Sequence, residues 1–272
     1  MSETPAVSVL MTAYNSESYI AEAIESVLNQ TFFNFEFVII DDASTDGTWP
    51  IIQRFAAQDS RIVVFKNKFN LGIPANRNKL VSLAKGKYLA WQDADDVSRP
   101  RRLEKQYQLM LSSPKVGICG GWLEFFADGK VISVRKYQAL DSELRKKIFR
   151  YSPVAQPAAM ITREVFVKIG LYNEQLPVAE DLELAFRIGQ FYQFANLSEV
   201  ILKYRQQKNS ITYQKLKNLE LNTLKIRRQF LDNQAYHFSG FDFLYNFFQW
   251  LTLYLLPARF RVAIFNLFRN KN

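Results

Sequence analysis

The chain has 272 residues, of which 48 % are hydrophobic and 22 % charged, a composition typical of a folded globular protein. With one cysteine (Cys119) and one histidine (His237), it can form neither an internal disulfide nor a structural zinc site of the usual composition, which indicates a reducing compartment. Residues 203–272 hold 12 Lys and Arg against three acidic residues and so account for the whole net charge of +9, whereas residues 1–202 are neutral, which argues against an extended nucleic-acid groove there.

The N-terminus shows no basic region followed by an apolar stretch, so the sequence predicts no signal peptide. No uninterrupted apolar run reaches the roughly 18 residues that a membrane-spanning helix needs. We therefore expect a cytoplasmic protein.

The first hundred residues alternate between apolar runs and amphipathic segments. Strands are predicted at 7–13, 35–40, 61–65 and 87–91, and helices at 20–28, 49–57 and about 74–84. Strands that alternate with helices at this spacing predict an α/β fold with a mostly parallel central sheet flanked by helices. In such sheets ligands collect beyond the carboxyl ends of the strands.

The second half is less regular. We expect helices at about 141–150 and 180–190 and a strand within 156–162. Two further helices, at about 213–232 and 241–256, predict a C-terminal helical extension, and Pro257 precedes an apolar stretch at 260–268.

Two acidic clusters follow predicted strands. In Asp93-Ala-Asp-Asp, the side chains of Asp93 and Asp95 alternate and so share one face, where a divalent Mg²⁺ or Mn²⁺ ion would neutralise them. The alternative is an acidic turn in which Asp95 or Asp96 caps the helix near Pro100.

The other cluster is Asp41-Asp42. A carboxylate there can accept hydrogen bonds from a base N–H or from ribose hydroxyls. The alternative is an Asx turn leading into the next helix, with Asp46-Gly47 completing the bend.

Taken in order, these segments resemble a family 2 glycosyltransferase with the GT-A fold, a Rossmann-like architecture. Val7-Ser-Val-Leu-Met-Thr-Ala-Tyr-Asn is similar to the opening strand of the family, which implies that Thr12, Ala13 and Tyr14 bind the nucleotide. Asp41-Asp-Ala-Ser-Thr-Asp-Gly-Thr resembles the second signature, which implies a contact between Asp42 and the base. Asn70-Leu-Gly-Ile-Pro-Ala-Asn-Arg-Asn resembles the segment whose arginine, here Arg77, lies near the diphosphate.

Two further motifs complete the resemblance. Asp93-Ala-Asp-Asp resembles the DxD motif, which implies that Asp95 binds the metal and that Asp93 lies near the ribose or the sugar. Glu180-Asp181-Leu-Glu-Leu resembles the family's acidic pair, which implies that both residues are catalytic, with Asp181 as the base. The alternative for this pair is a helix start that favours acidic residues through its dipole.

The resemblance covers residues 5–212. It implies a catalytic domain at 1–212, with nucleotide-sugar binding in 1–100 and acceptor binding in 101–212. The implied reaction is an inverting, metal-dependent transfer of one sugar from a nucleoside-diphosphate sugar, UDP by family default, to a hydroxyl of a glycan or lipid-linked acceptor in cell-surface polysaccharide synthesis. A Q-x-x-R-W motif, typical of processive synthases, is absent. Relatives often carry histidine where Gln207 and Gln156 stand.

The segment 213–272 is cationic and rich in aromatic residues. Its apolar stretch 241–256, followed by Arg259, Arg261, Arg269 and Lys271, is typical of a helix that lies in a bilayer interface, which predicts peripheral contact with the inner face of the plasma membrane. The alternatives are packing on the catalytic body and a homodimer contact.

Three rival functions remain. A nucleic-acid-binding protein lacks support, because no helix-turn-helix, zinc-finger or RNP-type pattern occurs, and we expect no nucleic-acid partner. A catalytically silent nucleotide-sugar-binding protein would not need Asp93, Asp95 and Asp181. A nucleotidyltransferase would carry a glycine- and basic-rich phosphate loop where this chain has Thr12-Ala-Tyr-Asn.

Overall fold

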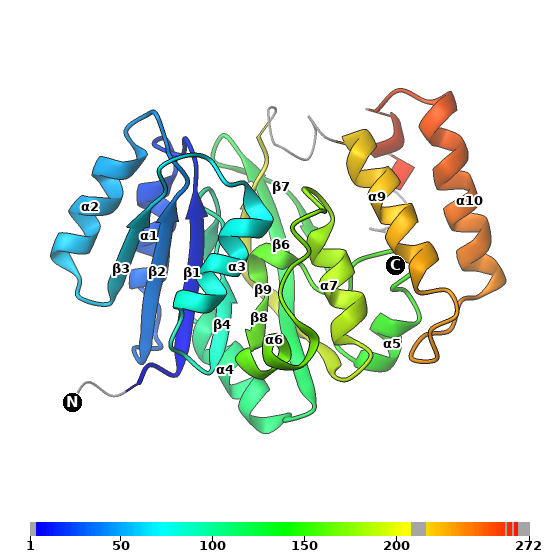
Figure 1. Cartoon of the computed structure of the whole chain (residues 1–272), viewed down its shortest axis with the longest axis horizontal. Helices are drawn as coiled ribbons and strands as arrows, with labels where there is room; N and C mark the ends of the chain where they lie inside the picture. Colours follow the sequence, from blue (N-terminus) through cyan, green and yellow to red (C-terminus); the bar gives the residue numbers. More distant parts are fainter. Residues whose placement is uncertain (1–3, 208–215, 259, 263, 266–272) are drawn as a thin grey trace.

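The computed structural model describes residues 4–207, 216–258, 260–262 and 264–265 (Figure 1). The strands of this part of the chain are β1 (Val7–Ala13), β2 (Phe35–Asp41), β3 (Ile62–Lys66), β4 (Tyr88–Trp91), β5 (Val97–Ser98), β6 (Val116–Ala127), β7 (Lys130–Arg135), β8 (Met160–Thr162) and β9 (Gln193–Arg205). The helices are α1 (Ile20–Leu28), α2 (Thr48–Gln58), α3 (Ile73–Leu83), α4 (Arg102–Ser112), α5 (Asp141–Arg145), η1 (Gln156–Ala158), α6 (Arg163–Ile169), α7 (Glu180–Ile188), α9 (Leu216–Gln229) and α10 (Gly240–Leu255).

All the strands belong to one mixed sheet in the order β3-β2-β1-β4-β8-β6-β9-β5, with β7 paired to β6. The first four strands are parallel to one another, as the sequence predicts. Beyond β4 the sheet becomes mixed, because β8 is antiparallel to both β4 and β6, and β9 is parallel to β6. The prediction of a mostly parallel sheet therefore holds for the N-terminal half.

Alternation along the buried strands supplies two cores, one on each face of the sheet. Leu10 and Val38 point to the face covered by α3, α6 and α7, whereas Met11 and Phe37 point to the face covered by α1, α2 and α4. Because helices cover both faces, these strands are apolar at nearly every position, the pattern typical of a parallel sheet.

Two predicted elements differ from the structure. The helix expected at 141–150 ends at Arg145, and residues 146–150 form turns. The strand expected within 156–162 is divided into the short helix η1 and strand β8, because Pro157 cannot donate to a ladder.

Helices α9 and α10 lie at the end of the molecule opposite α2 (Figure 1). After Pro257, residues 258, 260–262 and 264–265 are helical, whereas the rest of the predicted stretch to 268, together with Arg259, Arg269 and Lys271, lies outside the described residues. The predicted boundary at 212–213 also lies outside them. None of the helices in the described ranges has the length and apolarity to cross a bilayer.

Candidate functional site

The loops that follow β1 and β2 are joined by hydrogen bonds between their backbone and side chains. The amide of Ser16 donates to Thr48 Oγ1 at 2.7 Å, and the amide of Gly47 donates to Glu17 Oε2 at 2.7 Å. Asn15 adopts a left-handed backbone (φ 48°), which asparagine tolerates, and its Oδ1 accepts from the Thr45 amide at 2.9 Å. The carboxyl edge of the parallel strands is therefore a fixed surface.

Two buried polar atoms at this edge have no hydrogen-bond partner among the described residues: Thr12 Oγ1 and Asp41 Oδ1. The other oxygen of Asp41 accepts from the Ser44 amide, three residues on, at 3.2 Å, whereas the two-residue spacing of an Asx turn occurs at Asp46, whose Oδ1 accepts from the Thr48 amide at 3.0 Å. Tyr14, next to Ala13 at the end of β1, leaves 49 % of its surface exposed. Buried polar atoms without partners are costly in a folded protein, and a bound ligand is one way to satisfy them.

The carboxylate of Asp42 is occupied by the protein itself. Its Oδ1 accepts from Asn67 Nδ2 at 2.8 Å and from the Leu71 amide at 2.9 Å, and its Oδ2 accepts from the Gly72 amide at 3.0 Å. Asp42 therefore holds the loop that precedes α3, and its neighbour Asp41 carries the unpartnered oxygen.

Helix α3 carries Arg77 into the interior. Gly72 has φ 80°, a conformation that glycine adopts without strain, and Pro74 occupies the first turn of the helix. The guanidinium of Arg77 forms an ion pair with Glu180 and lies over the rings of Trp91 and Tyr172, at 5.6 and 5.4 Å from their centroids. Two regions about a hundred residues apart thus meet at this side chain.

Three carboxylates act on the Arg77 charge: Glu180, which forms an ion pair with it, and Asp93 and Asp181, which interact with it electrostatically. Burial opposes the charge of Arg77, but these acidic groups and Tyr172 outweigh it and raise the pKa of the guanidinium. Burial raises the pKa of Asp93, an effect that Arg77 and Arg102 oppose and Asp181 reinforces. The structure therefore brings the DxD segment and the Glu180-Asp181 pair into one electrostatic cluster.

Asp95 continues this cluster. Burial raises the pKa of Asp95 to about 6, and the charge of Asp93 adds to the rise. Oδ2 of Asp95 accepts a hydrogen bond from Nε2 of Gln207 at 2.7 Å, which lowers the pKa in part. Gln207, the position where relatives often carry histidine, thus contacts the predicted metal ligand directly.

Asp96 does not cap a helix, contrary to one sequence-based alternative. Its Oδ1 accepts from the Arg205 amide at 2.9 Å, and α4 begins at Arg102 without a side-chain cap. The Arg205 guanidinium donates to the Asp95 carbonyl at 2.9 Å and pairs with Glu22 of α1. Arg205 therefore joins the end of β9 to the DxD segment.

The donor set fits a hard divalent cation. Asp95 offers a carboxylate whose charge the surroundings disfavour, Asp96 Oδ2 is buried without a partner, and a half-turn of the Gln207 amide would present its carbonyl oxygen. Within the described ranges, no three His, Cys, Asp or Glu side chains form a set that could hold a metal. Mg²⁺ and Mn²⁺ often take only one or two protein carboxylates and complete their shell with substrate phosphates and water.

Arg102 supports the cluster from within the protein and has no counterpart among the predicted site residues. It is 1 % exposed and donates to the carbonyl of Trp91, to Gln92 Oε1 at 3.1 Å and to Ser98 Oγ at 2.9 Å. Burial lowers its pKa to about 10. Arg102 and Arg205 resemble ordinary surface arginines in the sequence, so no sequence signal distinguishes them.

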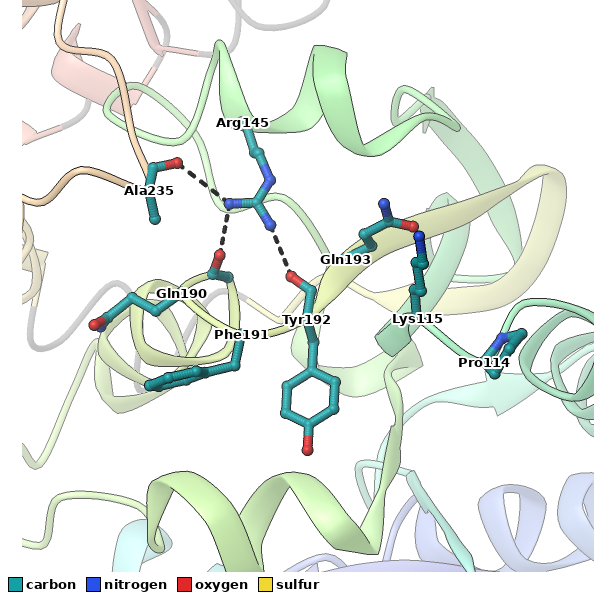
Figure 2. A pocket seen from close by; sticks show the side chains of 9 residues that line it. Pro114, Lys115, Arg145, Gln190, Phe191, Tyr192, Gln193 and Ala235 are labelled. Carbon is teal, nitrogen blue, oxygen red and sulfur yellow. Dashed lines mark hydrogen bonds between the residues drawn. The ribbon is translucent and has the colours of Figure 1, made fainter.

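A surface pocket of about 600 Å³, lined in part by Arg145 and Tyr192, contains none of the site residues described above. Arg145 donates there to the carbonyls of Gly189, Tyr192 and Ala235, and Figure 2 shows its bonds to Tyr192 and Ala235. Because these bonds connect α5, the end of α7 and the segment before α10, the function of Arg145 is to hold these elements together.

The chain is similar to glycosyltransferases in both sequence and fold. The sequence model of glycosyl transferase family 2 matches residues 8–170. An uncharacterised glycosyltransferase of Methanocaldococcus jannaschii is 32 % identical over 260 residues, covering 93 % of this chain and 89 % of that one. A Bacillus subtilis glycosyltransferase, TuaG, whose name assigns it to teichuronic acid biosynthesis, is 32 % identical over 78 % of this chain and 84 % of its own.

Solved structures share the fold at lower identity. The mannosyltransferase PcManGT of Pyrobaculum calidifontis, solved with GDP-Man and Mn²⁺, superposes with a TM-score of 0.66 at 18 % identity, covering 93 % of this chain and 71 % of that one. TarS of S. aureus, residues 1–349 with UDP-GlcNAc, gives a TM-score of 0.63 at 20 % identity, with 83 % and 71 % covered. The fold is GT-A, and the chain belongs to glycosyl transferase family 2.

Proposed function

We propose that this transferase is metal-dependent and inverting, and that it moves one sugar from a nucleoside-diphosphate sugar, UDP-linked by preference, to a hydroxyl of a glycan or lipid-linked acceptor. The observation that carries the proposal is the ion pair of buried Arg77 with Glu180, together with the electrostatic interactions of Arg77 with Asp93 and Asp181 and of Asp93 with Asp95. TuaG, named for a polysaccharide pathway, supports a role in cell-surface polysaccharide synthesis.

One group of residues would bind the sugar donor. Thr12, Tyr14 and Asp41 would take the nucleoside at the ends of β1 and β2, where polar atoms lack partners. Asp95, with the Gln207 oxygen, would hold a divalent cation, which supplies neutralisation of charge at the leaving diphosphate when bound. PcManGT with GDP-Man and Mn²⁺ supports this assignment.

Asp181 would remove the proton from the acceptor. The acceptor oxygen forms a bond to the anomeric carbon on the face opposite the diphosphate, the bond to the leaving phosphate oxygen breaks, and Asp181 receives the hydroxyl proton. Glu180 accepts from Arg77 in the structure, so we assign it to positioning that arginine near the diphosphate. One displacement inverts the stereocentre without a protein nucleophile.

A donor panel tests the proposal. We expect purified protein with Mn²⁺ to release nucleoside diphosphate from one nucleotide sugar, to lose that activity in EDTA, and to form a product whose anomeric configuration by NMR is opposite to that of the donor. Donor binding by calorimetry without any turnover would instead indicate a silent binding protein. Equal turnover with and without EDTA would refute the metal role.

A further inference from the structure

Helix α10 turns its polar side toward the protein. Asp242, Asn246 and Gln249 recur at helical spacing and share one face. Asp242 pairs with Arg150 at 2.8 Å, Asn246 Nδ2 donates to the Phe149 carbonyl at 3.0 Å, and Gln249 Oε1 accepts from Arg227 at 2.8 Å. A helix that only covers a core turns its apolar stripe inward, so the orientation of α10 is the reverse of the usual one.

The opposite side of α10 is apolar and exposed. Its large side chains each leave between 45 and 66 % of their surface open: Phe243, Leu244, Phe247, Phe248, Tyr254 and Leu255. The helix contains no Lys or Arg, and its one charged residue, Asp242, is buried. We call these six residues the aromatic face. Contiguous apolar surface of this kind is rare on proteins that work alone in water and marks an interaction site.

Buried polar contacts fix this orientation. Arg227 of α9 is buried and donates to Asn246 Oδ1 at 3.0 Å and to Gln249 Oε1 at 2.8 Å. At the start of α10, Ser239 and Asp242 form a capping box. Rotating the aromatic face inward would break these two bonds and replace them with apolar contacts to a buried guanidinium, a costly exchange. Figure 1 shows α10 as the outermost helix, with α9 between it and α7.

The net charge of this region favours one kind of partner for the aromatic face. Residues 203–272, which contain α9 and α10, carry the whole net charge of +9, while residues 1–202 are neutral. A second copy would bring two cationic segments together, which like-charge repulsion disfavours. An anionic lipid surface offers an apolar layer for the aromatic face and opposite charge for Lys217, Lys225 and Arg228, which are exposed on the adjacent helix α9. We propose that α10 lies in the headgroup region of a membrane that contains anionic lipid.

Vesicle co-sedimentation of the full-length chain tests this proposal apart from the proposed reaction, because no donor or acceptor is present. We expect the protein to partition at least about tenfold more strongly onto vesicles of phosphatidylcholine with phosphatidylglycerol than onto phosphatidylcholine alone, with the difference shrinking as salt rises. Absence of binding, or equal partition onto both vesicles, would overturn the proposal.

Variants locate the contact. The double substitution Phe243→Glu with Phe247→Glu should lower partition more than about tenfold, because each change removes an aromatic ring from the apolar layer. Phe33→Glu is the control. Phe33 lies before β2, far from α10 in the chain, and its aromatic side chain is 75 % exposed, so this variant should bind as the wild type does. Binding of the double variant at wild-type strength contradicts the proposal. A dimeric wild type and a monomeric double variant in light scattering would also contradict the proposal, since that outcome assigns the aromatic face to a second copy.

Fluorescence gives a readout that needs no destabilising change. Trp250 lies on α10 and is 47 % exposed, so its emission should shift to shorter wavelength when anionic vesicles are added. Trp250→Phe should abolish that shift while sedimentation persists. A shift that survives Trp250→Phe would place the contact elsewhere on the chain.

Discussion

Nε2 of Gln207 donates to Oδ2 of Asp95 at 2.7 Å, although the two residues are separated by 112 positions in the chain. The bond favours the ionised form of a carboxylate that burial and Asp93 would otherwise hold closer to neutral. The same amide carries an oxygen on its other side, so a half-turn converts a hydrogen-bond donor into a candidate metal ligand. A cation bound at Asp95, as we propose, would therefore also meet the Gln207 amide.

Gln207→His should change metal preference. Imidazole suits transition metals better than Mg²⁺, so the ratio of Mn²⁺ to Mg²⁺ affinity should rise several-fold over wild type. Calorimetric titration of both ions in the presence of UDP measures the ratio. Gln206→His, one position earlier, is the matched control, and an equal rise in both variants would show that contact with Asp95 is irrelevant.

Stability without metal should fall as pH rises. Burial raises the pKa of Asp93, Asp95 and Asp96 in the folded protein above the value of about 3.8 in the unfolded chain. Their protonated forms therefore stabilise the fold fully below pH 3.8. This stabilisation is lost as the pH rises through the folded-state pKa, which is about 6 for Asp95. Asp95→Asn should therefore raise the free energy of unfolding in EDTA at pH 7.5, by at most about 3 kcal/mol.

Urea denaturation at pH 4 and 7.5 measures this effect. The control is Asp59→Asn, which should have the opposite sign at pH 7.5, because the hydrogen bonds from Arg61 lower the pKa of Asp59 despite partial burial. Added Mn²⁺ should stabilise the wild type and leave Asp95→Asn unchanged. An Asp95→Asn variant less stable than wild type at pH 7.5 in EDTA would contradict the assignment.

Asp181→Asn should retain donor binding and lose transfer by about 10²–10⁴-fold, the usual contribution of a general base. Calorimetry with donor and Mn²⁺ measures the first quantity and initial rates the second. Glu183→Gln, on the same helix but paired with Arg187, should keep both. Loss of donor binding in Asp181→Asn would reassign this residue to the structure of the site.

Arg77→Ala should destabilise the protein by about 3–5 kcal/mol, because it leaves the buried Glu180 without its cation. Adding Glu180→Gln should restore much of that loss, since no uncompensated charge then remains. Chemical denaturation of the four proteins in this cycle gives the coupling energy. Additive effects of the two substitutions would show that the ion pair does not carry the stability.

The N-terminal half was predictable from the sequence because its strands are buried on both faces. Such strands are continuous apolar runs, and their ends coincide with turn residues, so the bounds of β1 agree with the prediction. Beyond the first hundred residues, β6 contains Gly120 and Gly121, which the sequence does not distinguish from loop residues. The structure shows that a Cβ at Gly121 would come within 2.8 Å of Ile201 on β9, so glycine here permits close approach of two strands.

In the site as well, local sequence patterns predict some features, and others depend on long-range contacts. Acidic residues at strand ends were predictable because parallel strands end at one edge. The contacts of Asp95 with Gln207 and of Asp96 with Arg205 depend on β9 lying next to β5, a long-range pairing that no local pattern encodes. The sequence singles out Asp42, but the loop before α3 bonds to Asp42 and leaves an oxygen of Asp41 without a partner. The sequence does not show which of two adjacent carboxylates such a loop engages.

The pairing of β5 with β9 also bears on biosynthesis. Strand β5 leaves the ribosome about a hundred residues before its partner, and the family match ends at residue 170, before Asp181, Arg205 and Gln207 are made. A nascent chain that stops short of Gln207 holds the acidic segment but lacks the side chains that position it. The acidic segment therefore stays without its hydrogen-bond partners Arg205 and Gln207 until the end of β9 has been made.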